Sequence, residues 1–167
     1  MKALSLWQPW ASAMAVGAKR IETRSWPAVA SGHAFRGWVA IHASKRTHWP
    51  KDAPAAVSGM SLENTFEYHL RISLESYQLF VGNGFGVFSS LPMGAVVAVG
   101  WMNYCESTTD LKVSELEAMW GGYEAGRYGW VFSEMWRLND PMPARGKQKL
   151  FDLDMPANWQ AASTRVF

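Results

Sequence analysis

The segment 17–24, Gly-Ala-Lys-Arg-Ile-Glu-Thr-Arg, concentrates side chains that can move protons. Lys19 supplies an amine, Glu22 a carboxylate and Thr23 a hydroxyl, and such a set can activate a nucleophile. In an extended strand Lys19 and Thr23 share one face while Glu22 lies on the other. A turn or bulge is therefore needed to bring all three into one pocket. The alternative interpretation is a solvated strand edge of mixed charge.

Two strand ends carry further polar candidates. His42 lies near the end of an apolar strand and Lys45 follows it, where the lysine can hold a ribose or a phosphate. A histidine on an apolar strand is more often a hydrogen-bonded core residue, and Lys45 is equally compatible with a solvated position. Glu106 follows a long apolar stretch, where partial burial suits a carboxyl group to acid–base work, with a solvated strand-end acid as the alternative.

Aromatic side chains are frequent and are a second possible source of binding energy. The chain has ten tryptophans, of which we expect most to fill the core and some to line a pocket that stacks a planar ring. Arg127 precedes Tyr128 and, two residues further on, Trp130. A cation beside two rings can clamp a nucleic-acid base, although the same cluster also occurs as ordinary strand packing.

Other site chemistries find little support in the sequence. The four histidines do not have the spacing of a helical zinc motif and Cys105 stands alone, so we expect no metal ion and no other cofactor. No Gly-x-Ser-x-Gly sequence is present, which argues against a serine hydrolase of that type.

Length and composition limit the class of protein. The 167 residues suit a single domain over 1–167, and 49% hydrophobic with 18% charged residues indicates a globular chain. The net charge of +2 is compatible with nucleic acid but is weak for a dedicated duplex binder. A single cysteine excludes an internal disulfide, and no apolar run approaches the length of a membrane span. We therefore expect a cytoplasmic protein with no membrane partner.

The hydrophobic pattern predicts several strands separated by a few helices. It indicates an α+β fold, a mixed or antiparallel β-barrel with helices covering its ends. The prolines in 139–146 indicate a connector. We expect strands at 2–7, 20–24, 37–44, 94–105, 127–138 and 149–153, the last being the final strand, and helices at 10–16, 62–81 and 114–120.

Three motifs together resemble the ASCH domain family, named for homology to activating signal cointegrator 1. They are Leu-Ser-Leu-Trp-Gln-Pro-Trp at 4–10, Gly-x-Lys-x-x-Glu-x-Arg at 17–24 and Val-Ala-Ile-His-Ala at 39–43. Later stretches at 94–106, 111–117 and 145–156 are similar to the branch that contains the endothelium-overexpressed lipopolysaccharide-associated factor. The resemblance implies a PUA-like β-barrel. It covers nearly the whole chain except about 48–90, which we expect to be a helical insertion.

The resemblance also implies a function. Many members of the family are presumed to bind RNA or nucleotides, and small bacterial members are amidohydrolases that remove acyl groups from N(4)-acylated cytidine with a lysine, a threonine and a glutamate. Lys19 matches the lysine, but Glu22 stands at the threonine position and Thr23 follows it. Either Thr23 attacks the substrate, or Lys19 and Glu22 activate water. Glu106 is the candidate for the second acid.

The expected substrate is therefore a modified pyrimidine nucleoside. The alternatives are a non-catalytic module that binds single-stranded RNA or a modified base, and a single-strand ribonuclease. The predicted catalytic residues are Lys19, Glu22, Thr23 and Glu106, and the predicted substrate-binding residues are Trp7, Gln8, Pro9, Arg24, Trp26, His42, Lys45, Arg127 and Tyr128.

Overall fold

The computed structural model describes residues 1–47, 78, 82–83 and 90–167. Most of its elements are strands, accompanied by the helices α1 (Trp10–Ala15) and α5 (Glu115–Ala118) and the 3-10 helix η3 (Trp159–Ala162). This is the small α+β, barrel-like fold that the sequence predicts. The expected helix over 62–81 and the insertion over 48–90 fall almost entirely outside the described residues.

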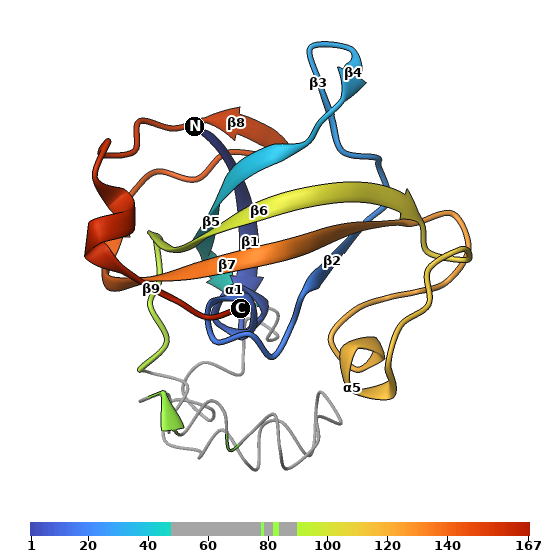
Figure 1. Cartoon of the computed structure of the whole chain (residues 1–167), viewed down its shortest axis with the longest axis horizontal. Helices are drawn as coiled ribbons and strands as arrows, with labels where there is room; N and C mark the ends of the chain where they lie inside the picture. The colour runs from blue at the N-terminus through green and yellow to red at the C-terminus, as the bar shows by residue number, and fades with distance from the viewer. Residues whose placement is uncertain (48–77, 79–81, 84–89) are drawn as a thin grey trace.

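One mixed sheet forms the body of the protein and curls into a half-barrel (Figure 1). Its order is β2-β7-β6-β5-β1-β8, with β9 added along β7. The β1–β5 pair is parallel and the other pairs are antiparallel. Its strands are β1 (Lys2–Gln8), β2 (Ile21–Arg24), β5 (Gly37–Thr47), β6 (Ala95–Ser107), β7 (Tyr128–Pro143), β8 (Leu150–Asp152) and β9 (Ser163–Arg165).

The helix α1 packs against four strands of the sheet, β1, β5, β6 and β7. It is rich in alanine, and Ala11, Ala13 and Met14 are completely buried. Small side chains allow the short helix to approach the strands closely, so it closes the apolar interior of the half-barrel. Gly17 then adopts φ +80°, as expected for the residue that ends a helix.

The chain between β2 and β5 forms a two-stranded hairpin that extends away from the sheet (Figure 1). It consists of β3 (Val29–Ala30) and β4 (His33–Ala34). Its two turn residues, Ser31 and Gly32, both have positive φ, which matches the right-handed twist of a tight hairpin.

Strand β7 is longer than its sequence predicts. The connector expected over 139–146 is wrong for its first half, because β7 continues to Pro143, which lies opposite Ala95 of β6. The pairing is irregular between Val96 and Ala98, and a bulge of this kind relaxes the regular ladder of hydrogen bonds. The prediction that 149–153 is the final strand is also wrong, since β9 follows β8.

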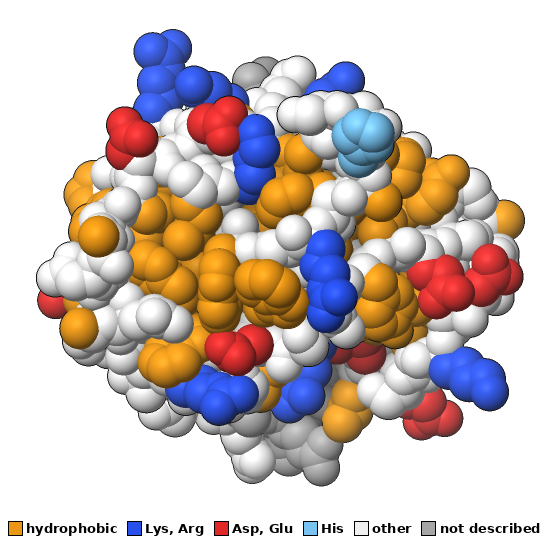
Figure 2. All heavy atoms as spheres, turned by 45° about the horizontal axis from the view of Figure 1, so that its top comes forward, with side chains coloured by type: hydrophobic (Ala, Val, Ile, Leu, Met, Phe, Trp, Pro, Cys, Tyr) orange, Lys and Arg blue, Asp and Glu red, His pale blue; other side chains and the backbone are white. Residues whose placement is uncertain are grey.

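The tryptophans divide between the core and the surface. Trp120 and Trp130 are buried, whereas the Trp7 side chain is 46% exposed. Figure 2 shows one face on which hydrophobic side chains are exposed among scattered basic and acidic ones, so this face is not uniformly charged. Within the described residues, no helix has the length and apolar character that crossing a membrane requires.

Candidate active site

A turn before β2 brings Lys19 to the side chain of Glu22. After α1, the Gly17 N–H donates to the Met14 carbonyl at 3.1 Å, and the Lys19 N–H donates to the Ala13 carbonyl at 3.2 Å. The chain therefore folds back on the helix before β2 begins at Ile21. As a result the Lys19 Nζ lies 3.4 Å from Glu22 Oε2. The turn that the sequence requires is present, and the solvated-edge alternative is wrong because Lys19 is 1% exposed and Glu22 8%.

The amine of Lys19 has three acceptors, two backbone carbonyls and one carboxylate. It donates to the Ile21 carbonyl at 2.6 Å and to the Trp120 carbonyl at 2.9 Å, and it forms the ion pair with Glu22. An ammonium group has three hydrogens and no acceptor, so three acceptors match its hydrogen-bonding capacity. Lys19 is therefore arranged as a buried cation that fixes the positions of its neighbours.

The Glu22 carboxylate lies between two cations. Its second oxygen, Oε1, is 2.9 Å from the Nε of Arg24, and the Arg24 Nη2 donates to the Ser5 carbonyl at 2.9 Å. A buried carboxylate requires opposite charge close by, and Glu22 has it on both sides. Arg24 thereby connects β2 to β1, and its ion pair with Glu22 holds the carboxylate beside this connection.

The Thr23 hydroxyl has different partners. Its Oγ1 accepts a hydrogen bond from the Gly122 N–H at 3.2 Å. The Arg127 Nη2 donates to the Thr23 carbonyl at 3.1 Å, and the Arg127 Nε donates to the Gly122 carbonyl at 3.2 Å. Thr23 is thus bonded to the segment that leads into β7, and its hydroxyl is bonded to that segment rather than to Lys19 or Glu22.

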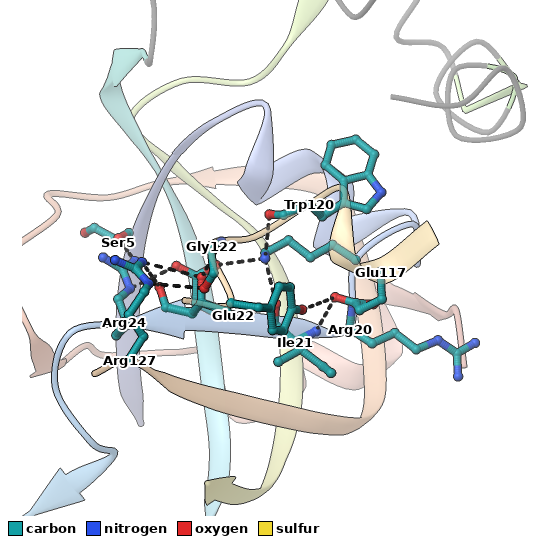
Figure 3. A network of polar contacts seen from close by, with 12 residues as sticks. Ser5, Arg20, Ile21, Glu22, Arg24, Glu117, Trp120, Gly122 and Arg127 are labelled. Carbon is teal, nitrogen blue, oxygen red and sulfur yellow. Dashed lines mark hydrogen bonds and ion pairs between the residues drawn. The ribbon is translucent and has the colours of Figure 1, made fainter. Parts of the chain in front are cut away.

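Glu117 is a buried carboxylate that sequence reasoning missed as a site residue. Its Oε2 accepts from the Arg20 N–H and its Oε1 from the Ile21 N–H, both at 2.9 Å. The Tyr123 hydroxyl donates to the same Oε1 at 3.4 Å, and burial together with the Glu117 charge raises the pKa of Tyr123. Figure 3 shows Glu117 beside the start of β2. The sequence identified this residue only as part of a helix cap, and Ser114 does accept from its N–H at 3.2 Å.

A pocket of about 420 Å³ opens beside this network. It brings together Lys19, Glu22 and Thr23, three of the predicted catalytic residues, and its volume lies within the roughly 300–1,000 Å³ of small-molecule sites. The lining residues are Ser5, Leu6, Trp7, Trp10, Lys19, Glu22, Thr23, Arg24, Met119, Trp120, Gly121, Gly122 and Arg127.

A larger groove of about 1,200 Å³ adjoins the pocket, because Ser5, Trp7 and Arg24 line both. The groove is also lined by His42, Trp26 and Lys45, all three predicted to bind substrate. Arg145, which was not predicted, lines it as well. His42 is buried, with its Nε2 3.1 Å from the Ala144 carbonyl and its Nδ1 3.1 Å from Ser5 Oγ. Burial lowers the pKa of His42, so the neutral ring donates through Nε2 and accepts through Nδ1.

The remaining predicted residues line neither cavity. Gln8 is fully buried, where it donates to Ser12 Oγ at 2.8 Å and to the Pro92 carbonyl at 2.7 Å. Pro9 precedes α1, and Tyr128 packs against the core. Glu106 is exposed near the end of β6. These four stay predictions, and the structure does not bring them to the pocket.

The chain matches no known family model and no curated protein. Among the described residues, no group of three or more His, Cys, Asp or Glu side chains is placed to hold a metal ion. The pocket has a charged group at its wall, formed by Lys19, Glu22 and Arg24.

Proposed function

We propose that this protein is an amidohydrolase that removes acyl groups from N(4)-acylated cytidine or a related pyrimidine nucleoside. The observation that carries the proposal is the charge group at the wall of a nucleoside-sized pocket, in which Lys19 and Glu22 are buried and Arg24 is partly exposed. The same residues belong to the motif that resembles the ASCH family, and the half-barrel sheet is compatible with a PUA-like barrel. We therefore assign the chain to that family as part of the proposal.

Water is the proposed nucleophile and Glu22 the proposed general base. Glu22 takes a proton from water while the water oxygen bonds to the acyl carbon, giving a tetrahedral intermediate. The C–N bond then breaks, and the proton passes to the departing N(4) nitrogen, so the products are cytidine and a carboxylic acid. The Thr23 hydroxyl is bonded to Gly122 rather than to Glu22, which favours water over Thr23 as the attacking group.

The other pocket residues have supporting roles. Lys19 uses its three hydrogens to hold Glu22 and two carbonyls, so it positions the base and compensates its charge. Arg127 lines the pocket and supplies positive charge near the oxygen that becomes negative in the intermediate. The exposed ring of Trp7 offers a flat surface on which the pyrimidine stacks.

The decisive experiment compares two variants on N(4)-acetylcytidine, with cytidine release followed by chromatography. Glu22→Gln cannot accept the proton and is expected to lose about 10²- to 10⁴-fold in kcat/KM. Thr23→Val removes the hydroxyl and takes the acceptor away from the Gly122 N–H, yet its kcat/KM is expected to stay within about tenfold of wild type because the hydroxyl is not the attacking group. Circular dichroism checks that both variants fold. Full activity in Glu22→Gln overturns the proposed mechanism. The amidohydrolase function is overturned if the wild type deacylates neither N(4)-acetylcytidine nor its 5′-monophosphate.

A non-catalytic module that binds a modified base or single-stranded RNA is the second candidate. The observation that favours it is that the three hydrogens of Lys19 are all directed at acceptors within the protein. Such an arrangement is typical of a charge cluster with a structural role. Such a module predicts that N(4)-acetylcytidine binds without any product being formed. Calorimetric binding of that nucleoside, with no cytidine released after long incubation, is the result that distinguishes it.

A further inference from the structure

Positive charge is segregated in the groove beside the pocket. Five of its lining residues are cationic, whereas none of the described lining residues is an aspartate or a glutamate. The whole chain has 16 basic and 14 acidic residues, so an average surface would show both signs. A groove with cations alone attracts anions. The five cations are Arg24, Lys45, Arg145, Lys147 and Lys149.

The segment that carries three of these cations is fixed on the sheet at its centre. Gly146 lies so close to β5 and β1 that an added Cβ would collide with the His42 ring and would come within 2.7 Å of Ser5 Oγ. Ala144, two residues earlier, is also fixed at both backbone groups. Its carbonyl accepts from His42, and its N–H donates to the Gly94 carbonyl at 3.0 Å. Arg145 and Lys147 flank the glycine, and both are exposed.

Lys45 reaches the groove from the end of β5. The aliphatic part of this side chain crosses the backbone of Gly94, where an added Cβ would lie 2.8 Å from Lys45 Cε and 3.2 Å from Cγ. The Gly94 N–H also donates to the Ala43 carbonyl at 2.8 Å. A lysine stem that lies along the surface holds its ammonium group at the rim of the groove.

Arg24 connects the groove to the pocket. It lines both cavities while its Nε is paired with Glu22 and its Nη2 with the Ser5 carbonyl. A ligand in the pocket that extends past Arg24 therefore reaches the other cations of the groove. The groove, at about 1,200 Å³, has room for more than one phosphate group.

We propose that this groove binds the phosphate groups of the substrate, so that the protein acts on a nucleotide or a polynucleotide in preference to a free nucleoside. The base pocket in this proposal rests on the proposed function. The phosphate site itself rests on the five cations, of which only Arg24 is paired with the Glu22 carboxylate in the ion pairs described above, on the absence of acidic residues among the described lining and on the shared wall at Arg24.

Calorimetry with unmodified ligands tests the groove without relying on turnover. The probes are cytidine, cytidine 5′-monophosphate and a short oligocytidylate, each titrated at low salt. The groove variant is Arg145→Ala with Lys147→Ala. The matched control is Arg36→Ala with Lys112→Ala, which removes the same charge from exposed residues that line neither cavity.

We expect cytidine 5′-monophosphate to bind wild type at least about tenfold more tightly than cytidine, as one charge-assisted contact allows. The groove variant is expected to lose this preference and leave cytidine binding unchanged, while the control keeps it. For the oligocytidylate, the slope of log affinity against log salt is expected to fall by about 1.4 in the groove variant, at about 0.7 per phosphate contact on a single strand. A further gain from monophosphate to oligocytidylate identifies a polynucleotide, and equal affinities identify a mononucleotide.

Three results overturn the proposal. They are equal affinities of wild type for cytidine and its monophosphate, an equal loss in the control variant, and no measurable binding of any probe. These outcomes are separate from the fate of the amidohydrolase function. Release of cytidine from N(4)-acetylcytidine without a phosphate preference removes the groove proposal alone, whereas a phosphate preference without turnover removes only the catalytic function.

Discussion

Replacement of Lys19 by methionine tests the buried charge group most directly. The Lys19→Met side chain has nearly the same length and shape, but it lacks the ammonium group. The carbonyls of Ile21 and Trp120 then lose a donor, and Glu22 keeps only Arg24 as a cationic partner. The change therefore leaves three buried acceptors short of hydrogen bonds rather than simply removing one attraction.

The expected loss of stability follows from this burial. Removing one partner of a buried ion pair typically costs about 3–5 kcal/mol. For a domain of this length each kcal/mol lowers the melting temperature by about 2–4 °C, so we expect a decrease of about 6–20 °C. An exposed lysine outside both cavities, Lys112, supplies the matched control, and Lys112→Met is expected to change the free energy of unfolding by less than about 0.5 kcal/mol.

Urea and thermal unfolding, followed by circular dichroism, measure both changes. A double-mutant cycle of Lys19→Met with Glu22→Gln adds the coupling between the two side chains, expected at about 1–3 kcal/mol. If Lys19→Met is as stable as Lys112→Met, the ammonium group does not hold the network together and the reasoning is refuted. The result also matters for enzymology, since a loss of activity in a Lys19 variant is interpretable only under conditions where the variant is folded.

Three further outcomes are expected. Glu106→Gln should keep kcat/KM within about threefold and stability within about 0.5 kcal/mol, because this exposed carboxylate lines neither cavity; a large loss of kcat/KM would restore it as the second acid. Gly146→Ala should lower the free energy of unfolding by about 1–3 kcal/mol, since its Cβ collides with His42. Gly82→Ala, whose Cβ would meet no atom of the described residues within 4 Å, should show little change in thermal unfolding. Burial lowers the pKa of His42 in the folded protein, so as pH falls the histidine of the unfolded chain binds a proton at a higher pH than the folded one. The free energy of unfolding should therefore fall as pH drops below about 6.5. Urea titrations at about pH 7.5 and about pH 5.5 check this, and His42→Gln should show a smaller decrease.

Local patterns predicted much of the fold. The apolar stretches that became β1, β5 and β6 were identified from their composition, and the alanine-rich segment with Gly17 after it predicted α1 and its end. These signals are local, since periodicity and helix caps involve residues a few positions apart. The extension of β7 to Pro143 was missed because prolines usually interrupt strands. Pro141 lies in the irregular stretch of the pairing with β6, and Pro143 pairs with Ala95 at the end of β7.

The candidate site was predicted where one motif carried it and missed where distant segments met. Lys19, Glu22 and Arg24 lie within six residues, so the sequence could propose their contact. Glu117 reaches the start of β2 from 96 residues away, and no spacing rule links the two. Gln8 was predicted to bind substrate because it is a polar residue within a motif. Its amide is instead completely buried, where it bonds to Ser12 of α1 and to the Pro92 carbonyl.

Strand β8 has a consequence for folding and local opening. It has three residues and lies at the edge of the sheet, where Lys2 of β1 pairs with Asp152, 150 residues away along the chain. Contacts of such high sequence separation are expected to form late in folding and to open early, before the extensive β6–β7 ladder separates. The segment with Arg145, Lys147 and Lys149 leads directly into β8, so opening of this edge releases one wall of the groove. A ligand that contacts both Lys45 and this segment should therefore slow amide hydrogen exchange in β8 more than in β6. Binding in the groove would then stabilise the contact between β1 and β8, the two ends of the chain that meet at this edge of the sheet.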